Sequence, residues 1–407
     1  MSEKGKKPKI RFKGFNDEWE ERKLGEIANK VSDKNIYNAI LETFTNSAEY
    51  GVISQRDFFD HDIAKTEKIN GYYIIQSNDF VYNPRISVLA PCGPINCNRL
   101  KRSGVMSPLY TIFRTYNNID ISYLEWYFKS NYWHTYMYFN GDTGARADRF
   151  SIKDEIFFKM PIPFLNIKEQ QKIGKYFEKI DNLITLNQKK YYKLVNIKKS
   201  MLEKMFPKNE NTVPEIRFKG FYEPWEKRKL GDVVNVYDGT HQTPHYKENG
   251  IMFLSVENIA TLKSDKFISE EAFQKDYKVY PQKGDVLMTR IGDVGTPNIV
   301  ETTEKLAFYV SLALLKPIKI NSYFLCSVIL SPLFKKGLKN RTLVTAIPQK
   351  INKDEIGKID MMLPISLREQ EKIGEYFYNL DRLISLQQKK LEKLKNLKKA
   401  FLEKMFV

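Results

Sequence analysis

Few side chains in this sequence have the types and spacing that catalysis or metal binding requires. The 407 residues include only four histidines. His241 and His245 have the i, i+4 spacing of a zinc pair, but Pro244 between them disfavours the helix that would place both on one face. The three cysteines form no CxxC pattern, which argues against a thiolate metal site and a disulfide framework. We therefore predict no metal site in this chain.

Motifs for nucleotide chemistry are also missing. The sequence has no GxxxxGK[ST] phosphate loop and no GxGxxG dinucleotide motif. Residues 83–86 (NPRI) lack the second proline and the aromatic residue with which adenine methyltransferases hold a flipped base. Residues 21–23 (ERK) have no upstream Pro-Asp to complete a nuclease carboxylate cluster. No nucleophile and base are placed to act together, so no catalytic residue is predicted.

Composition and charge indicate a globular protein with an affinity for polyanions. The 66 Lys and Arg residues outnumber 49 Asp and Glu for a net charge of +17, and 42% of the residues are hydrophobic. No apolar run approaches the roughly 18 residues that cross a bilayer. The first ten residues, MSEKGKKPKI, lack the apolar stretch of a signal peptide. We expect a cytoplasmic protein without membrane contact.

The chain contains an internal repeat. Residues 8–15 (PKIRFKGF) return as 214–221 (PEIRFKGF). The closest match ends each half, where residues 169–206 align without a gap to 369–406. A period of about 200 residues is far longer than that of a solenoid. Each copy is therefore a domain with an extension.

The matched ends of the two copies predict two long helices. Their apolar residues alternate steps of three and four, as in the a/d seam of a coiled coil. An amide occupies the same heptad position in both, as register-setting polar residues do in paired helices. We expect the helices to pair antiparallel, although each could instead pack on its own domain. The predicted seam residues are Ile173, Phe177, Ile180, Ile184, Asn187, Tyr191 and Leu194, with Ile373, Phe377, Leu380, Ile384, Gln387, Leu391 and Leu394.

The remaining segments predict two mixed domains. Strand-like runs such as 72–76 alternate with helical ones such as 122–130. The predicted fold class is mixed α/β, with two similar α/β domains joined by two long antiparallel coiled-coil helices in a pseudo-twofold repeat. The expected boundaries are 1–165 for the first domain, 166–206 for its helix, 207–366 for the linker and second domain, and 367–407 for the second helix.

This arrangement resembles the specificity subunit of type I DNA restriction–modification systems. The resemblance covers essentially the whole chain. It rests on the paired starts at residues 10–25 and 216–231, on DGTHQTP at 238–244 ahead of GIMFLSVEN at 250–258, on GDVL at 284–287, and on the paired EQxKIGxYF helices.

The resemblance implies a non-catalytic subunit. In that family each globular domain is a target recognition domain that reads one half of a bipartite sequence in double-stranded DNA. The two helices set the spacer and dock two methyltransferase subunits, and restriction subunits join the full complex. No cofactor is then expected in this chain, whereas S-adenosylmethionine, ATP and magnesium are expected on the partner subunits. The alternatives are a coiled-coil adaptor that binds protein without reading DNA and an enzyme with an unrecognised nuclease site.

Base-reading residues are expected where the two copies diverge. Residues 141–151 (GDTGARADRFS) and 341–351 (RTLVTAIPQKI) both precede KDEI but differ from each other. Polar and basic side chains there and on neighbouring loops can bond base edges or phosphates, or they can simply be solvated. The predicted DNA-binding residues are Arg85, Arg99, Lys101, Arg102, Arg146, Arg149, Thr240, His241, Gln242, Thr243, Arg290, Arg341, Thr345, Gln349 and Lys350.

Most of the excess positive charge lies on the predicted helices. Residues 166–206 contain 10 Lys and 4 acidic residues, and residues 367–407 contain 10 Lys and Arg and 6 acidic residues. The two globular domains are therefore only mildly basic. Their specificity must come from a few placed side chains.

Overall fold

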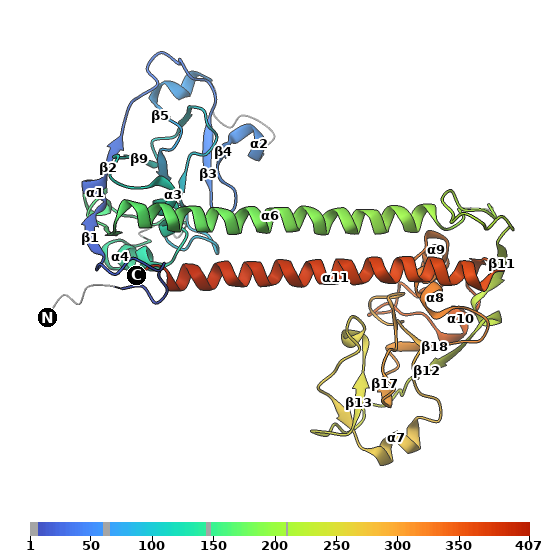
Figure 1. Ribbon diagram of the computed structural model, residues 1–407. Coiled ribbons are helices and arrows are strands. Elements are labelled where there is room, and N and C mark those ends of the chain that lie inside the picture. The colour runs from blue at the N-terminus through green and yellow to red at the C-terminus, as the bar shows by residue number, and fades with distance from the viewer. Residues whose placement is uncertain (1–6, 60–65, 144–147, 209–210) are drawn as a thin grey trace. The chain divides into compact units, whose positions relative to one another are not determined.

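The computed structural model describes residues 7–59, 66–143, 148–208 and 211–407. The chain divides into two compact units. Unit 1 combines Met1–Asn187 with Lys390–Val407, and unit 2 is Gln188–Lys389. The boundaries cross two helices of 38 residues each, α6 (Ile167–Lys204) and α11 (Leu367–Lys404), which are the green and red helices of Figure 1. Each unit therefore contains helical turns from both copies of the repeat.

Unit 1 is built around a four-stranded antiparallel sheet in the order β2-β9-β6-β7. Within the described residues of unit 1, three two-stranded sheets, β1-β10, β3-β4 and β5-β8, accompany it. The elements before α6 are β1 (Glu20–Lys23), α1 (Leu24–Ile27), β2 (Ala28–Val31), β3 (Phe44–Ser47), β4 (Gly51–Ser54), α2 (Gln55–Phe59), a 3-10 turn (Thr66–Gly71), β5 (Tyr73–Ile75), β6 (Phe80–Tyr82), β7 (Ile95–Cys97), β8 (Gly104–Met106), β9 (Thr111–Thr115), α3 (Ile121–Phe128), α4 (Tyr132–Asn140), α5 (Asp154–Phe157) and β10 (Pro161–Phe164).

Unit 2 repeats this framework with the antiparallel sheet β12-β18-β15-β16 and the pair β11-β19. Its second sheet differs from those of unit 1, because it has three strands in the order β14-β13-β17 and pairs β13 with β17 in parallel. The elements are β11 (Glu226–Lys229), two 3-10 turns (Leu230–Asp232 and Val256–Asn258), β12 (Val234–Asp238), β13 (Ile251–Leu254), β14 (Phe267–Ile268), α7 (Glu270–Asp276), β15 (Val286–Thr289), β16 (Pro297–Ile299), β17 (Leu306–Phe308), β18 (Leu312–Pro317), α8 (Ser322–Ile329), α9 (Pro332–Arg341), α10 (Lys353–Gly357) and β19 (Asp360–Leu363).

The long helices pack on each other within each unit. In unit 1, Ile180 and Ile184 of α6 form an apolar cluster with Leu391 of α11. The two helices run in opposite directions, because Tyr176, near the start of α6, packs on Phe401, near the end of α11, with ring centroids 5.2 Å apart (Figure 1). The predicted mixed α/β fold with two similar domains and two long antiparallel helices is confirmed.

The same interhelical ion pair occurs in both units. Lys398 pairs with Asp181 in unit 1, and Lys198 pairs with Asp381 in unit 2. Lysine and aspartate each recur at the repeat offset of 200 residues. The same antiparallel register of the two helices therefore occurs in both units.

The first turns of each long helix pack on the domain that precedes them. Ile173 and Phe177 lie in the core of unit 1, where the Phe177 ring stacks on Trp126 of α3 at 5.2 Å. Gly174 permits this approach, because a Cβ there would lie 2.8 Å from the Cβ of Ser122. Ile373 and Phe377 occupy the corresponding core of unit 2. The seam residues of each long helix thus pack on the preceding domain in the first turns and on the other long helix further along. No helix in the described ranges has the length and apolar character to cross a membrane.

The far end of each helix completes the core of the other copy's unit. Phe406, at the end of α11, stacks on Phe177 of unit 1 at 5.9 Å, and Phe206, at the end of α6, lies 5.9 Å from both Phe377 and Trp225 of unit 2. The starts of the two copies bond to the same helix ends, through Ile10 N to Lys404 O at 3.0 Å and Ile216 N to Lys204 O at 2.9 Å.

The paired EQ sequence at the start of each helix binds its domain through buried polar groups. Glu369 is 1% exposed and accepts two hydrogen bonds from Arg217 at 2.7 and 2.8 Å. Arg11 and Glu169 form the same pair in unit 1. Charge-assisted, two-pronged bonds of this kind are strong and directional. They fix the angle at which each domain meets its helix.

We predict that Arg217→Ala lowers the free energy of unfolding of unit 2 by about 3–5 kcal/mol, because it leaves the buried Glu369 carboxylate without its cationic partner. Chemical denaturation followed by tryptophan fluorescence measures this. Lys219→Ala, an exposed lysine two residues away, serves as the control and should change stability by less than about 0.5 kcal/mol. Equal losses in the two variants would contradict the structural role of the pair.

Candidate nucleic-acid interface

In unit 2 the loop that follows β15 pairs with the loop that diverges between the copies. Gly292 N donates to Gln349 O at 2.8 Å, and Ile351 N donates to Arg290 O at 3.0 Å. We call residues 290–296 and 342–350 the loop pair of unit 2. The divergent loop is therefore attached to the central sheet by main-chain bonds that do not depend on its side chains.

Unit 1 has the same loop pair, formed within the described residues by 84–94, 142–143 and 148–150. Ile86 N donates to Asp148 O at 3.0 Å, and Phe150 N donates to Pro84 O at 2.8 Å. These bonds correspond one for one to those of unit 2, although the sequences differ. Both domains thus present divergent side chains from an equivalent platform.

The buried side chain of Arg290 connects three loops of unit 2. Its side chain is only 6% exposed, its Nε donates to the carbonyl of Ile351 at 3.0 Å, and its guanidinium pairs with Asp238. The other carboxylate oxygen of Asp238 lies 3.8 Å from His241 Nε2. Arg290 was predicted to contact DNA, but its buried guanidinium is engaged by groups of the protein itself. It instead holds the loop that carries Thr240, His241, Gln242 and Thr243 beside the loop pair.

The other predicted residues of unit 2 lie on or next to these loops. Gln349 and Lys350 are exposed, and the Gln349 amide donates to Gly292 O at 2.9 Å. Thr345 is exposed near the turn of the divergent loop. Arg341 is half-buried and donates to Glu355 at 2.7 Å. The structure therefore leaves Thr345, Gln349 and Lys350 more open than Arg341.

In unit 1, Arg85 and Arg149 come together. Their backbones form a β-bridge, and the Arg85 side chain is 71% exposed with Asp148 at 3.7 Å. Arg149 is half-buried. Arg146 lies outside the described residues. Among the described residues of the predicted set, Arg85 is therefore the most exposed positive group at the loop pair of unit 1.

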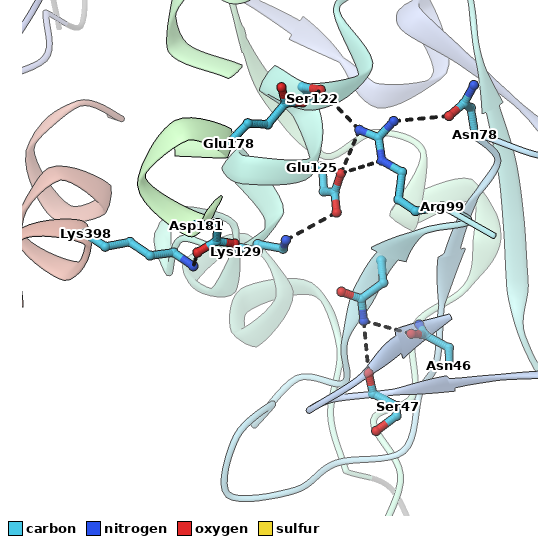
Figure 2. A network of polar contacts seen from close by, with 11 residues as sticks. Asn46, Ser47, Asn78, Arg99, Ser122, Glu125, Lys129, Glu178, Asp181 and Lys398 are labelled. Atoms are coloured by element: carbon cyan, nitrogen blue, oxygen red, sulfur yellow. Dashed lines mark hydrogen bonds and ion pairs between the residues drawn. The ribbon is translucent and has the colours of Figure 1, made fainter. Parts of the chain in front are cut away.

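Arg99 and Arg102 are engaged in ion pairs away from the loop pair. Arg99 bonds to Glu125 at 2.9 Å, to Asn78 at 3.1 Å and to Ser122 at 3.2 Å, and Figure 2 shows it directed at helix α3. Ser122 in turn donates to Glu178 of α6, so Arg99 joins its loop to the long helix.

The neighbouring cations Arg102 and Lys101 differ from each other. Arg102 makes two bonds to Glu42 at 2.7 and 2.8 Å, and these hydrogen bonds lower the pKa of that carboxyl. Lys101 is exposed. Of the predicted cluster at residues 99–102, Lys101 is thus the group most open to a phosphate.

A buried amide cluster that sequence reasoning missed supports the loop pair of unit 1. Asn46 is 1% exposed and donates to the carbonyls of Val81 and Pro94 at 2.8 and 3.1 Å, while Asn83 and Asn96 donate to Asn46. Figure 2 shows Asn46 and Ser47, which both accept hydrogen bonds from the Asn96 amide. No spacing in the sequence marks these residues, because they come from three separate strands and loops.

Helix α9 supplies a basic face that sequence reasoning also missed. Lys335, Lys336 and Lys339 are exposed, and no ion pair to any of them occurs within the described residues. The helix ends at Arg341, immediately before the divergent loop. In the sequence, this basic face is indicated by the run KKGLKNR at residues 335–341. We call these three lysines the α9 lysines.

The chemistry available at these loops is hydrogen bonding and positive charge. Burial raises the pKa of Cys97 to about 12 and also raises that of Cys92, so both thiols stay protonated near neutral pH. No group of three or more metal-ligating side chains occurs within the ranges that the structure describes. The arrangement suits recognition of an anionic, hydrogen-bonding surface.

We predict that Arg290→Met speeds amide hydrogen exchange about 10- to 100-fold in residues 238–243 and 343–351, because charged hydrogen bonds of this kind contribute about 1.5–3 kcal/mol. Lys350→Met, on the same loop but exposed, is the control and should leave exchange unchanged. Unchanged exchange in the Arg290 variant, or a uniform increase over all of unit 2, would show that Arg290 does not tie these loops.

The chain matches a family model described as the type I restriction modification DNA specificity domain, over residues 16–196 and again over 222–396. A curated relative from Methanocaldococcus jannaschii, the type I restriction enzyme MjaVIII specificity subunit, is 27% identical over 266 residues. That match covers 62% of this chain and 62% of the relative, so it spans less than two thirds of the relative's length.

Two solved structures share the fold. The type I restriction-modification system S subunit from M. genitalium has a TM-score of 0.58 at 16% identity, over 98% of this chain and 99% of that chain. A chain from a study of complex assembly and conformational transition of the type I R-M system has a TM-score of 0.54 at 16% identity, over 95% of this chain and 97% of that chain. Since the family model matches both halves and most of its length, this chain belongs to the type I restriction modification DNA specificity domain family.

Proposed function

We propose that this chain is the sequence-reading subunit of a type I restriction–modification complex. Each unit reads one half of a bipartite sequence in double-stranded DNA, and the paired helices set the spacer between the halves. The observation that carries the proposal is the equivalence of the two loop pairs, which share their main-chain bonds and differ in their side chains. Such a platform can change the bases it reads without changing its fold.

The charges around the loop pair of unit 2 support a nucleic-acid ligand. The three α9 lysines and Lys350 are exposed beside a loop that carries Thr345 and Gln349. Lysine contacts to phosphates supply affinity without sequence information, whereas short polar side chains on base edges supply specificity. Both kinds of group lie within one continuous segment, residues 335–350.

The exposed leucines of the long helices suit two copies of one protein partner. Leu183 and Leu186 in unit 1 recur as Leu383 and Leu386 in unit 2, and each is about half exposed. Two equivalent apolar faces are what two identical methyltransferase subunits would require. We propose that these partners and the restriction subunits carry S-adenosylmethionine, ATP and magnesium, and that this chain does not catalyse a reaction on its own.

The first test exchanges residues 213–366 for the corresponding domain of another such subunit. The complex with the methyltransferase should then modify a sequence in which one half is new and the other half and the spacer are unchanged. Sequencing of methylated adenines in genomic DNA measures this. The matched control exchanges residues 8–165 and should change the other half only.

Loss of both halves in either exchange, or no change in either, would contradict independent reading by the two units. A chain that assembles with partners but shows no sequence preference in any form would instead support the adaptor alternative.

The second test removes the α9 lysines together by substitution with alanine. Binding should weaken for specific and non-specific duplexes alike, and the slope of log K against log salt should fall by up to about 3, since each lysine accounts for about one phosphate. Lys275, Lys278 and Lys283, which are exposed elsewhere in unit 2, provide a triple-alanine control with the same change of charge. An equal effect in the control would assign the loss to net charge alone.

A further inference from the structure

Both loop pairs carry aliphatic side chains that are exposed to solvent rather than packed in a hydrophobic core. Val88 and Leu89 of unit 1 are 102% and 69% exposed, and Val344 and Ile347 of unit 2 are 68% and 101% exposed. Leu343 of unit 2 is also exposed, at 44%. Single apolar residues are common on protein surfaces, but at least two on each of two equivalent loop pairs form a repeated feature. We call the four most exposed, Val88, Leu89, Val344 and Ile347, the loop aliphatics.

The loop aliphatics come from different segments in the two units. In unit 1 they lie on the loop after β6, while in unit 2 they lie on the divergent loop. The backbone bonds between the two loops are nevertheless equivalent, through Ile86 N to Asp148 O and Gly292 N to Gln349 O. Each unit therefore presents aliphatic side chains at an equivalent loop pair, but from a different segment of the chain.

The surroundings of the loop aliphatics are polar and positive. Val344 and Ile347 flank Thr345 and are followed by Gln349 and Lys350, which are exposed. Val88 and Leu89 follow Arg85, whose guanidinium is mostly exposed. A protein partner that covered an apolar patch would favour few charges at its centre. Duplex DNA combines phosphates for the cations with one apolar group on its base edges.

That apolar group is the 5-methyl of thymine in the major groove, which aliphatic side chains contact and which no other standard base carries. We propose that Val344 and Ile347 in unit 2, and Val88 and Leu89 in unit 1, contact thymine methyl groups of their respective half-sites and so read A·T pairs. This inference rests on the proposed function and adds specificity-determining residues to the hydrogen-bonding ones.

The test replaces thymine by deoxyuridine, which removes only the methyl group. The half-sites are first taken from the mapped methylation sequence, and duplexes are made with each thymine of one half-site replaced in turn. Binding is measured with the full chain in complex with its methyltransferase. For the wild type, one deoxyuridine in each half-site should weaken binding about fourfold, the effect of one buried methyl group.

The matched variants are Val344→Ala with Ile347→Ala, and Val88→Ala with Leu89→Ala. The first pair should bind the thymine duplex more weakly and no longer respond to deoxyuridine in the unit 2 half-site, while its response in the unit 1 half-site stays as in the wild type. The second pair should show the reverse. Because all four side chains are exposed, thermal unfolding of the variants should match the wild type.

Three results would overturn the inference. One is a half-site in which no thymine responds to deoxyuridine in the wild type. Another is a variant that loses equal affinity for thymine and deoxyuridine duplexes, which is the outcome for side chains inserted as wedges between base pairs. The third is a variant with unchanged DNA binding but weaker assembly with a protein partner. If the wild-type complex binds DNA without any sequence preference, the proposed function itself is refuted.

Discussion

The antiparallel contact between α6 and α11 is the interaction on which the rest of the structure depends. Each helix starts in the core of its own domain and ends in the core of the other copy's unit, where Phe206 and Phe406 lie among buried aromatic rings. The lysine–aspartate pairs, one in each unit, add directional bonds to the apolar seam. Neither unit has a complete core without turns from both helices, so pairing and domain folding are coupled.

This coupling separates the parts of the sequence that must stay constant from those that can vary. Three kinds of residue fix the packing between domain and helix. They are the Arg–Glu pairs of Arg11 and Arg217, the glutamine that follows each glutamate, and the glycines at 174 and 374. The loop pairs are joined by main-chain bonds and supported by a few interior side chains such as Arg290 and Asn46, so the exposed side chains of the loops are free to differ. A domain of this kind can therefore change the side chains it presents at little cost in stability.

Much of the fold could be predicted because it depends on periodicity, which a single sequence displays. The helices at 169–206 and 369–406 were visible as a heptad seam and as a repeat. The surroundings of the candidate residues could be predicted only in part. Divergence between the copies marked the loop of Thr345 and Gln349 as a candidate, but residue type alone could not tell that Arg290 is buried, or that Arg99 and Arg102 bond to carboxylates. Those pairings join segments far apart in sequence, as do the amides around Asn46.

The central claim is that the register of the paired helices fixes the spacing of two independently read half-sites. The most direct measurement inserts four residues into each helix, between Asn187 and Tyr191 and between Gln387 and Leu391, and maps the methylated sequence. Four residues lengthen a helix by about 6 Å and rotate it by about 40°, compared with about 3.4 Å and 35° per base pair. The account predicts unchanged halves and a spacer one or two base pairs longer. An active complex with an unchanged spacer would contradict it.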